Sequence, residues 1–497
     1  MAENPVYKLI AEREHYIYEC REDQLEINLS GFKGGRPYVD ERLSRFPGES
    51  KAEWEGSTRR DGSQITGRKA QSHSIPYLGR IVEKINQHVL GVRPERVNSD
   101  AEVLADITSD GESINSFMRR LNSQITVCRW AWIGLDMADV SPGTVSQADK
   151  ERYKLRPYWK LYTALDVVDW YIDPKGGVQW VLTDEEIYSA VDPRQKPVMQ
   201  CVRRLWELGK VTTYTYKPGT DKIISEEEKL LEVSQGVPLP VVPFVLVGEL
   251  SADPHQFDNL ESINKTIMDL ESCNRSNFFH SVFPQPFLPA SALDNVKQAF
   301  EVNADAAASM LFGQGYPVLL NQGDAAPGYI MPDASAIGTM RTEIDALRNA
   351  MFDVIGLMLA QETRQVASAE AKAWDYLDVA QVMRERAEIL EDAEKKAIAI
   401  MTQWDSSIQP WEPVYNRTFD AGSFSTEIQA ITQAMTVSMP DELTRFLLSK
   451  LFDRARKIGT NSVDPEEETL IAEAIKNFAP AAGAMTPFPA TNNFTGQ

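Results

Sequence analysis

Residues 340–358 read MRTEIDALRNAMFDVIGLM, and this stretch decides the class of fold. Its apolar side chains recur in alternating steps of four and three, the a/d pattern of a helix that packs along one seam. The seam consists of Met340, Ile344, Leu347, Met351, Val354 and Met358. The spacing therefore predicts a regular helix whose apolar face is covered by other helices, within one chain or across subunits.

Other helices are predicted on both sides of the seam. The longest covers residues 369–404, which at a rise of 1.5 Å per residue is about 50 Å. Pairs of opposite charge four residues apart on it, Glu391–Lys395 and Asp392–Lys396, indicate a solvated outer face. Further helices are predicted over residues 77–90, 114–128, 259–283, 292–310, 426–458 and 466–478.

Between about residues 155 and 224 the pattern changes from helical to β. Aromatic and β-branched residues fill 158–162, 167–172, 178–182 and 211–216. Because the connections between these runs are too short for helical crossovers, we expect antiparallel meanders. With a further buried strand at 130–135, the fold class is predicted to be α+β and mainly α.

Two segments show little periodicity, apart from the predicted helix 292–310 in the second. Residues 31–75 carry seven glycines and a local excess of basic residues, which predicts a long surface loop or a contact arm for a partner subunit. Residues 284–335 hold six prolines, which fix φ and remove backbone donors, and therefore predict a compact irregular insert.

Composition excludes several classes of protein. The 497 residues include 72 Asp+Glu against 51 Lys+Arg, a formal charge of −21, and such a surface repels the phosphates of nucleic acid and of anionic lipid. The four cysteines are far apart and are expected to be reduced core residues. Without a signal peptide or an apolar run of about 20 residues, a soluble intracellular protein that does not enter a membrane is expected.

No arrangement of residues predicts catalysis. The phosphate-binding GxxxxGK[ST] loop, the GxSxG elbow and the HExxH helix are all missing, and the five histidines are isolated. The acidic runs 184–186 and 466–468 are explained by solvation at a strand end and by capping of a helix start. We therefore predict no catalytic residue, no cofactor and no metal.

Taken in order, short segments between residues 77 and 404 resemble the portal proteins of tailed bacteriophages. No one of these segments is specific, but their order is moderately specific. They are the helix 77–90 followed by Gly91, DGES at 110–113 before Phe117, RPY at 156–158, DVVDW at 166–170, VPFV at 242–245, the helix at 259–279, ET at 362–363 and SAE at 368–370.

The resemblance implies a homo-oligomer, a closed ring of twelve subunits at a capsid vertex of the virion, assembled in the host cytoplasm. Double-stranded DNA would pass through it non-specifically during packaging and ejection. The ring would contact the major capsid protein, the terminase large subunit and a head–tail adaptor. The implied regions are an N-terminal arm and wing (1–258), a stem helix (259–283), a clip (284–335), a second stem helix (336–361), a tunnel loop (362–368), a long wing helix and connection (369–423), a helical crown (424–478) and a flexible tail (479–497).

Two groups of site residues follow from this resemblance. Candidates for the DNA channel are Gln361, Glu362, Arg364 and Gln365. Candidates for partner docking on the clip are Phe287, Leu288, Phe312, Tyr316 and Tyr329. The acidic balance suits a channel through which DNA slides without sticking, and it equally suits solubility alone.

Two interpretations of a different kind stay open. One is a large helical scaffold or adaptor that never surrounds DNA. The other is a hydrolase that uses Asp and Glu. The mass and shape of the assembly distinguish the three, because the portal interpretation requires a closed ring of about 670 kDa, twelve times the 55.8 kDa chain.

Overall fold

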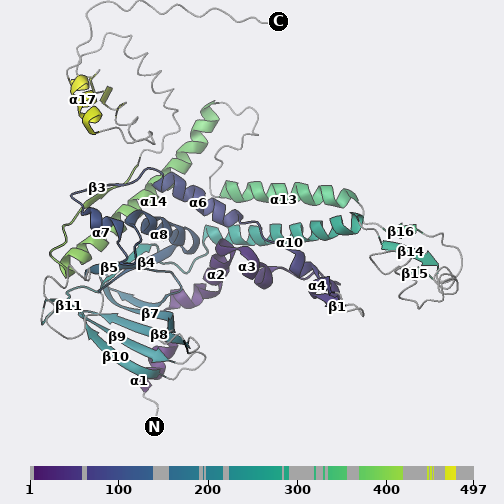
Figure 1. The fold of residues 1–497 in the computed structure, drawn as a ribbon, viewed down its shortest axis with the longest axis horizontal. Helices are drawn as coiled ribbons and strands as arrows, with labels where there is room; N and C mark the ends of the chain where they lie inside the picture. Colours follow the sequence, from purple (N-terminus) through teal and green to yellow (C-terminus); the bar gives the residue numbers. More distant parts are fainter. Residues whose placement is uncertain are drawn as a thin grey trace, which may run out of the picture. The chain divides into compact units, whose positions relative to one another are not determined.

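The computed structural model divides the chain into two compact units, residues 1–417 and 418–497, drawn in Figure 1. In the second unit, the described structure consists of helix α17 (Pro465–Lys476) and a few helical positions between 445 and 452. The described residues of the first unit are 5–58, 64–137, 156–189, 194, 198–216, 223–234, 236–282, 285–289, 318–320, 328–330, 334–354 and 369–417.

The core of the first unit is built on a three-stranded antiparallel sheet. Strand β4 (Trp130–Met137) lies between β13 (Phe244–Gly248) and β5 (Pro157–Tyr162). Helix α8 (Ile114–Cys128) packs on β4, and α6 (Tyr77–Leu90) packs on α8. The buried face of each helix is mostly apolar, and the buried Asn86 and Asn122 are hydrogen-bonded to each other (2.8 Å). The predicted buried strand at 130–135 is confirmed.

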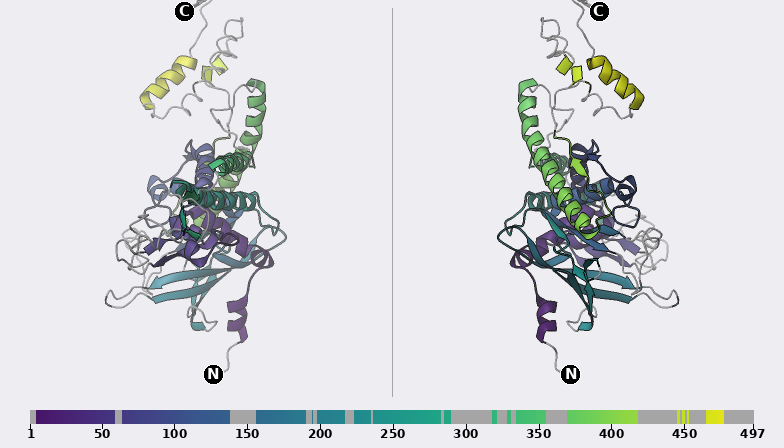
Figure 2. Two further views of the ribbon diagram at one scale, coloured as in Figure 1. Left: turned by 90° about the vertical axis from the view of Figure 1, so that its right-hand side faces the viewer. Right: turned by 90° about the vertical axis from the view of Figure 1, so that its left-hand side faces the viewer.

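A second sheet is a five-stranded meander, and Figure 2 shows it in two further views. Its antiparallel strands follow one another in chain order, which confirms the predicted meander for 167–172, 178–182 and 211–216, whereas the predicted strand at 158–162 pairs with β4 instead. They are β6 (Val167–Ile172), β7 (Val178–Ser189), β8 (Val198–Glu207), β9 (Lys210–Tyr216) and β10 (Ile223–Leu230).

Three long helices complete the first unit. Helices α10 (Gln256–Val282) and α13 (Ala334–Val354) lie side by side and run in opposite directions, while α14 (Ala369–Trp404) crosses the α/β body (Figure 1). The predicted helices at 77–90, 114–128 and 369–404 are confirmed at both ends, and that at 259–283 begins three residues earlier. The predicted helix 292–310 and nearly all of 426–458 lie outside the described residues.

The segment 31–75 is structured over residues 31–58 and 64–75, so the prediction of a long loop was wrong there. It completes α2 (Tyr16–Lys33) and forms α3 (Gly35–Arg42), α4 (Lys51–Glu55), the hairpin β1–β2 (Gly56–Thr58, Gln64–Thr66) and α5 (Arg68–Gln71). Gly34 and Gly35, with φ of 60° and 75°, separate two helices rather than opening a loop. Tyr38, Val39 and Leu43 are buried in one cluster with Met268 of α10.

The remaining elements are short. They are α1 (Pro5–Glu12), β3 (Glu95–Val97), α7 (Ala101–Ala105), β11 (Glu232–Ser234), β12 (Val237–Pro238), β14 (Gln285–Pro289), β15 (Val318–Leu320), β16 (Gly328–Ile330) and β17 (Glu412–Val414). The mixture of helices and antiparallel sheets confirms the predicted α+β class.

Candidate functional site: the α10–α13 pair and its anchors

A buried polar network holds the first half of α10 against the body. The Glu261 carboxylate, 2% exposed, accepts hydrogen bonds from Tyr38 Oη (3.1 Å) and Arg42 Nε (3.4 Å). Asn264 Nδ2 donates to the same tyrosine oxygen (3.1 Å). Burial raises the pKa of Tyr38, and the neighbouring Glu261 charge raises it further, so the phenol stays a neutral donor.

Arg68 of α5 joins α10 to the chain around Glu49. Arg68 makes a bidentate pair with Glu49 (Nε–Oε1 2.7 Å, Nη2–Oε2 2.8 Å) and donates through Nη1 to Ser272 Oγ on α10 (2.7 Å). Its guanidinium also stacks over Phe46, 3.8 Å from the ring centroid. The hydrogen bond from Arg68 lowers the pKa of Glu49. Helix α10 is therefore fixed at Ser272 by a charge-assisted hydrogen bond, in addition to its apolar packing.

Helix α13 packs on α10 through part of its predicted seam. Ile344 and Met351 are buried, and Met340 and Leu347 are half-buried. Val354 ends the described helix and its side chain is not described, and Met358 lies outside the described residues. That other seam residues are covered by a second chain stays a prediction.

The distal end of the pair leads into three short strands (Figure 1). Strand β14 pairs with β15 in parallel and with β16 antiparallel. The backbone of Phe287 lies opposite both Val318 and Gly328, Leu288 lies opposite Leu319, and Tyr329 lies opposite Pro286. Three of the five docking candidates thus belong to one small sheet.

The other candidates fall outside the described residues. They are Phe312 and Tyr316 of the predicted clip, and Gln361, Glu362, Arg364 and Gln365 of the predicted channel loop.

Helix α14 is held by a carboxylate with no exposed surface. Glu394 accepts from Arg96 Nε (2.6 Å) and Nη2 (3.0 Å), Trp411 Nε1 (2.9 Å) and Tyr415 Oη (2.7 Å). Burial alone would lower the pKa of Arg96, but the hydrogen bond and charge of Glu394 raise it above its ordinary value. This cluster joins α14 to β3 and to the two residues that flank β17. Strands β3 and β17 also pair with each other.

The predicted solvated face of α14 is only half right. Asp392 and Lys396 form an exposed pair (2.6 Å). Glu391 is buried instead. Its carboxylate accepts from Lys395 Nζ (2.7 Å) and from the backbone N–H of Tyr415 (3.2 Å). The i,i+4 pattern identifies both pairs and does not reveal that the chain after α14 folds back over one of them.

The acidic run 184–186 lies within β7, so the expectation of a solvated strand end was wrong. Asp184 accepts from Arg203 Nε (2.9 Å) and Tyr216 Oη (2.5 Å), and Glu185 pairs with Arg204 (3.0 Å) and with Lys160. Cations from neighbouring strands thus engage both carboxylates. Of the four cysteines, Cys128 and Cys201 are buried as expected, whereas Cys20 is exposed.

Sequence reasoning missed the buried arginine–carboxylate pairs that join distant segments. Besides the pairs of Arg68 and Arg96, Arg21 binds Asp258 in a bidentate contact (2.8 and 2.9 Å) across 237 positions. Asn28 adds a bond to the same carboxylate (2.8 Å). No local pattern distinguishes these arginines from exposed ones, because their partners are determined by tertiary structure.

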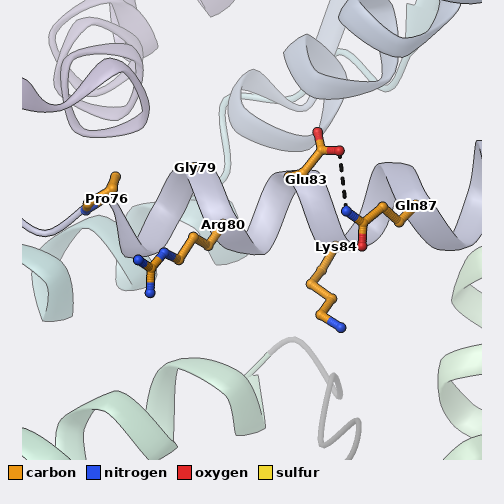
Figure 3. A pocket seen from close by; sticks show the side chains of 6 residues that line it. All are labelled: Pro76, Gly79, Arg80, Glu83, Lys84 and Gln87. Carbon is orange, nitrogen blue, oxygen red and sulfur yellow. Dashed lines mark hydrogen bonds between the residues drawn. The ribbon is translucent and has the colours of Figure 1, made fainter.

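A shallow hollow of about 410 Å³ lies on the outer face of α6. Figure 3 shows Arg80 and Lys84 on one side of this helix, away from Glu83. Glu83 accepts from Arg119 (3.1 Å) and Gln87 (3.5 Å). The lining residues are Pro76, Gly79, Arg80, Glu83, Lys84 and Gln87.

Two features are absent from the described residues. Across these ranges, no group of three or more His, Cys, Asp or Glu side chains is arranged to hold a metal ion. In the same part of the chain, no helix combines the length and apolar character needed to cross a membrane.

Comparisons with known proteins give partial structural likenesses. No family model matches the chain, and no curated protein matches it. Among solved structures, it is similar to a chain from the virion of a native gene transfer agent particle and to one from the neck of an empty particle of that kind, computed with C6 symmetry. Each match has a TM-score of 0.36 and 12% identity, and covers 80% of this chain and 90% of the other.

Proposed function

We propose that this chain is the subunit of a portal-type ring, a conduit for double-stranded DNA at a capsid vertex. The observation that carries the proposal is the α10–α13 pair. At the start of α10 it is anchored by the ion pairs Arg21–Asp258 and Arg42–Glu261, and its other end leads into the small sheet β14–β16. A helix that leaves the body and a second that returns would line a tube when copies stand side by side around an axis.

The surface of α13 supports a role in assembly. Packing on α10 leaves Leu347 and Met340 half-buried on the same stripe as the buried Ile344. A second copy standing beside the first would cover these apolar side chains, as knobs from one helix fill holes on another. We expect Val354 and Met358 to continue this contact.

The strands at the end of the pair are the proposed docking tip. They would bind the terminase large subunit during packaging and a head–tail adaptor afterwards, and the body would contact the major capsid protein. The net charge of −21 per chain disfavours tight phosphate contacts, which suits DNA that must slide. On this proposal the protein is a structural component of the virion and not an enzyme.

The decisive experiment measures the mass and shape of the purified full-length assembly. Native mass spectrometry and negative-stain images are expected to show closed rings near 670 kDa, about twelve chains of 55.8 kDa. A monomer or an open assembly under all salt conditions would contradict the portal proposal and favour a scaffold or adaptor.

A further inference from the structure

The outer face of α6 carries two cations that the described fold does not use. Arg80 and Lys84 are both exposed and, being four residues apart, lie on one face of the helix (Figure 3). Within the described ranges neither makes an ion pair. Like charges at this spacing slightly destabilise a helix, so the subunit alone gains nothing from the pair.

The neighbouring groups on this face leave the positive charge in place. Glu83 is engaged by Arg119 and Gln87, and in Figure 3 it points away from the two cations. At the start of the helix, Pro76 and Gly79 present little side-chain volume and line the hollow. The face therefore offers a small recess followed by two cations one turn apart.

Helix α2 carries a face with the opposite charge and matching spacing. Glu19, Asp23 and Glu26 are exposed on successive turns, and none forms an ion pair within the described residues. Tyr16, 68% exposed, begins the same face. The pKa of Glu14 is raised by burial and then by the charges of Glu22 and Glu19, which agrees with a local excess of negative charge.

The start of α2 is firmly held, so this face is presented in one orientation. The backbone N–H of His15 donates to the carbonyl of Val168 (2.8 Å), and its ring stacks on Trp170 at 4.0 Å. A rigid surface loses little conformational entropy when it docks.

We propose that α2 of one subunit docks on α6 of the next copy around the ring. Tyr16 enters the recess at Pro76 and Gly79, and the carboxylates of α2 pair with Arg80 and Lys84. Four residues advance a helix by about 6 Å on either partner, so two ion pairs form at once. Two different surfaces meet in this contact, and a heterologous contact of this kind can close into a ring. The inference rests on the proposed ring function and specifies one of its interfaces.

The test exchanges the charges of the two faces in the full chain. The variants are Arg80→Glu with Lys84→Glu, Glu19→Lys with Asp23→Lys, and all four together. The matched control for Arg80→Glu with Lys84→Glu is Lys51→Glu with Lys175→Glu. It changes the net charge by the same amount, at two exposed lysines elsewhere in the chain. Mass photometry over a dilution series measures the concentration at which the assembly dissociates, and circular dichroism verifies folding.

Each double reversal should raise the dissociation concentration about tenfold or more, because exposed pairs are individually weak but recur at every interface. The fourfold variant should return to within about threefold of wild type, and the control should not change. Tyr16→Ser should weaken assembly in the same direction.

Three results would overturn the contact. These are unchanged rings from Arg80→Glu with Lys84→Glu, a lack of rescue in the fourfold variant, and intact rings that lose only DNA retention, which would make the pair a phosphate contact. If wild type instead forms open chains that the reversals shorten and the combination restores, the α2–α6 contact stands and the closed-ring function fails.

Discussion

Three side chains from two separate segments meet at Glu394, and their four hydrogen bonds neutralise and saturate its carboxylate. Arg96 comes from β3, while Trp411 and Tyr415 come from the chain beyond α14. A charge with no exposed surface is tolerated because each oxygen has partners, and it becomes costly as soon as the network loses a member.

Glu394→Ala should therefore destabilise the first unit by about 3–5 kcal/mol, since it leaves the buried Arg96 guanidinium without its carboxylate partner. Asp392→Ala, two positions away on the same helix, removes an exposed pair and should change stability by less than about 1 kcal/mol. Urea unfolding of both variants compares the two effects directly. Equal losses would mean that the Glu394 network does not anchor α14.

His255 should make the protein sensitive to mild acid. Burial, together with the nearby positive charge of Arg386, lowers its pKa to about 4, although Asp258 opposes the shift. The unfolded chain binds this proton near pH 6.5, so the stabilisation is complete above that pH and is lost as pH falls toward 4.

The matched variant for this prediction is His255→Asn, because Asn also accepts well at a helix start, where the imidazole now accepts the N–H of Phe257. Wild type should lose on the order of 2–3 kcal/mol between pH 7 and pH 4 from this group, and the variant should lack that part of the slope. Thermal unfolding across the range gives the comparison. Parallel pH profiles would rule out His255 as the sensor.

At the scale of elements, strong periodicity made prediction reliable. Helices 77–90, 114–128 and 369–404 were predictable because each buries a stripe that is mostly apolar at helical spacing. The segment 31–75 was not, because its helices are short and most of its anchoring is polar, as with Arg68 and Glu49. The anchors of the candidate site were hidden for the same reason: their partners lie up to 298 positions apart. The seam of α13, by contrast, is a local pattern, and it located the helix pair.

The seam gives a prediction that separates the helix pair from the body. Met351→Asp would place an unpaired charge at a site with no exposed surface, so α13 should detach from α10 and assembly should fail. Thr342→Asp, an exposed position on the same helix, is the control. Hydrogen exchange should show lost protection over Ala334–Val354 while β4 and β5 stay protected. Normal exchange and normal assembly in Met351→Asp would show that this seam does not hold the pair.

At the scale of the whole molecule, the charge balance would determine how the proposed ring meets DNA. The proposed ring of twelve chains would carry on the order of −250 charges before screening, and the ions of 0.15 M salt screen exposed charges beyond about 8 Å. Proteins that grip duplex DNA neutralise several phosphates, and they lose affinity steeply as salt rises because counterions are released. A conduit must avoid that grip, since each held phosphate resists translocation.

We therefore expect purified rings to bind free duplex DNA with a Kd above about 10⁻⁴ M at 0.15 M salt. This affinity is weaker than that of the usual non-specific DNA-binding protein. Fluorescence anisotropy of a labelled duplex measures this, with a basic DNA-binding protein as the positive control in the same buffers. Any residual binding should vary little between 50 and 200 mM salt, because few counterions are released. Micromolar binding with a steep salt slope would instead reveal several phosphate contacts, and a grip of that kind is incompatible with an acidic channel through which DNA slides.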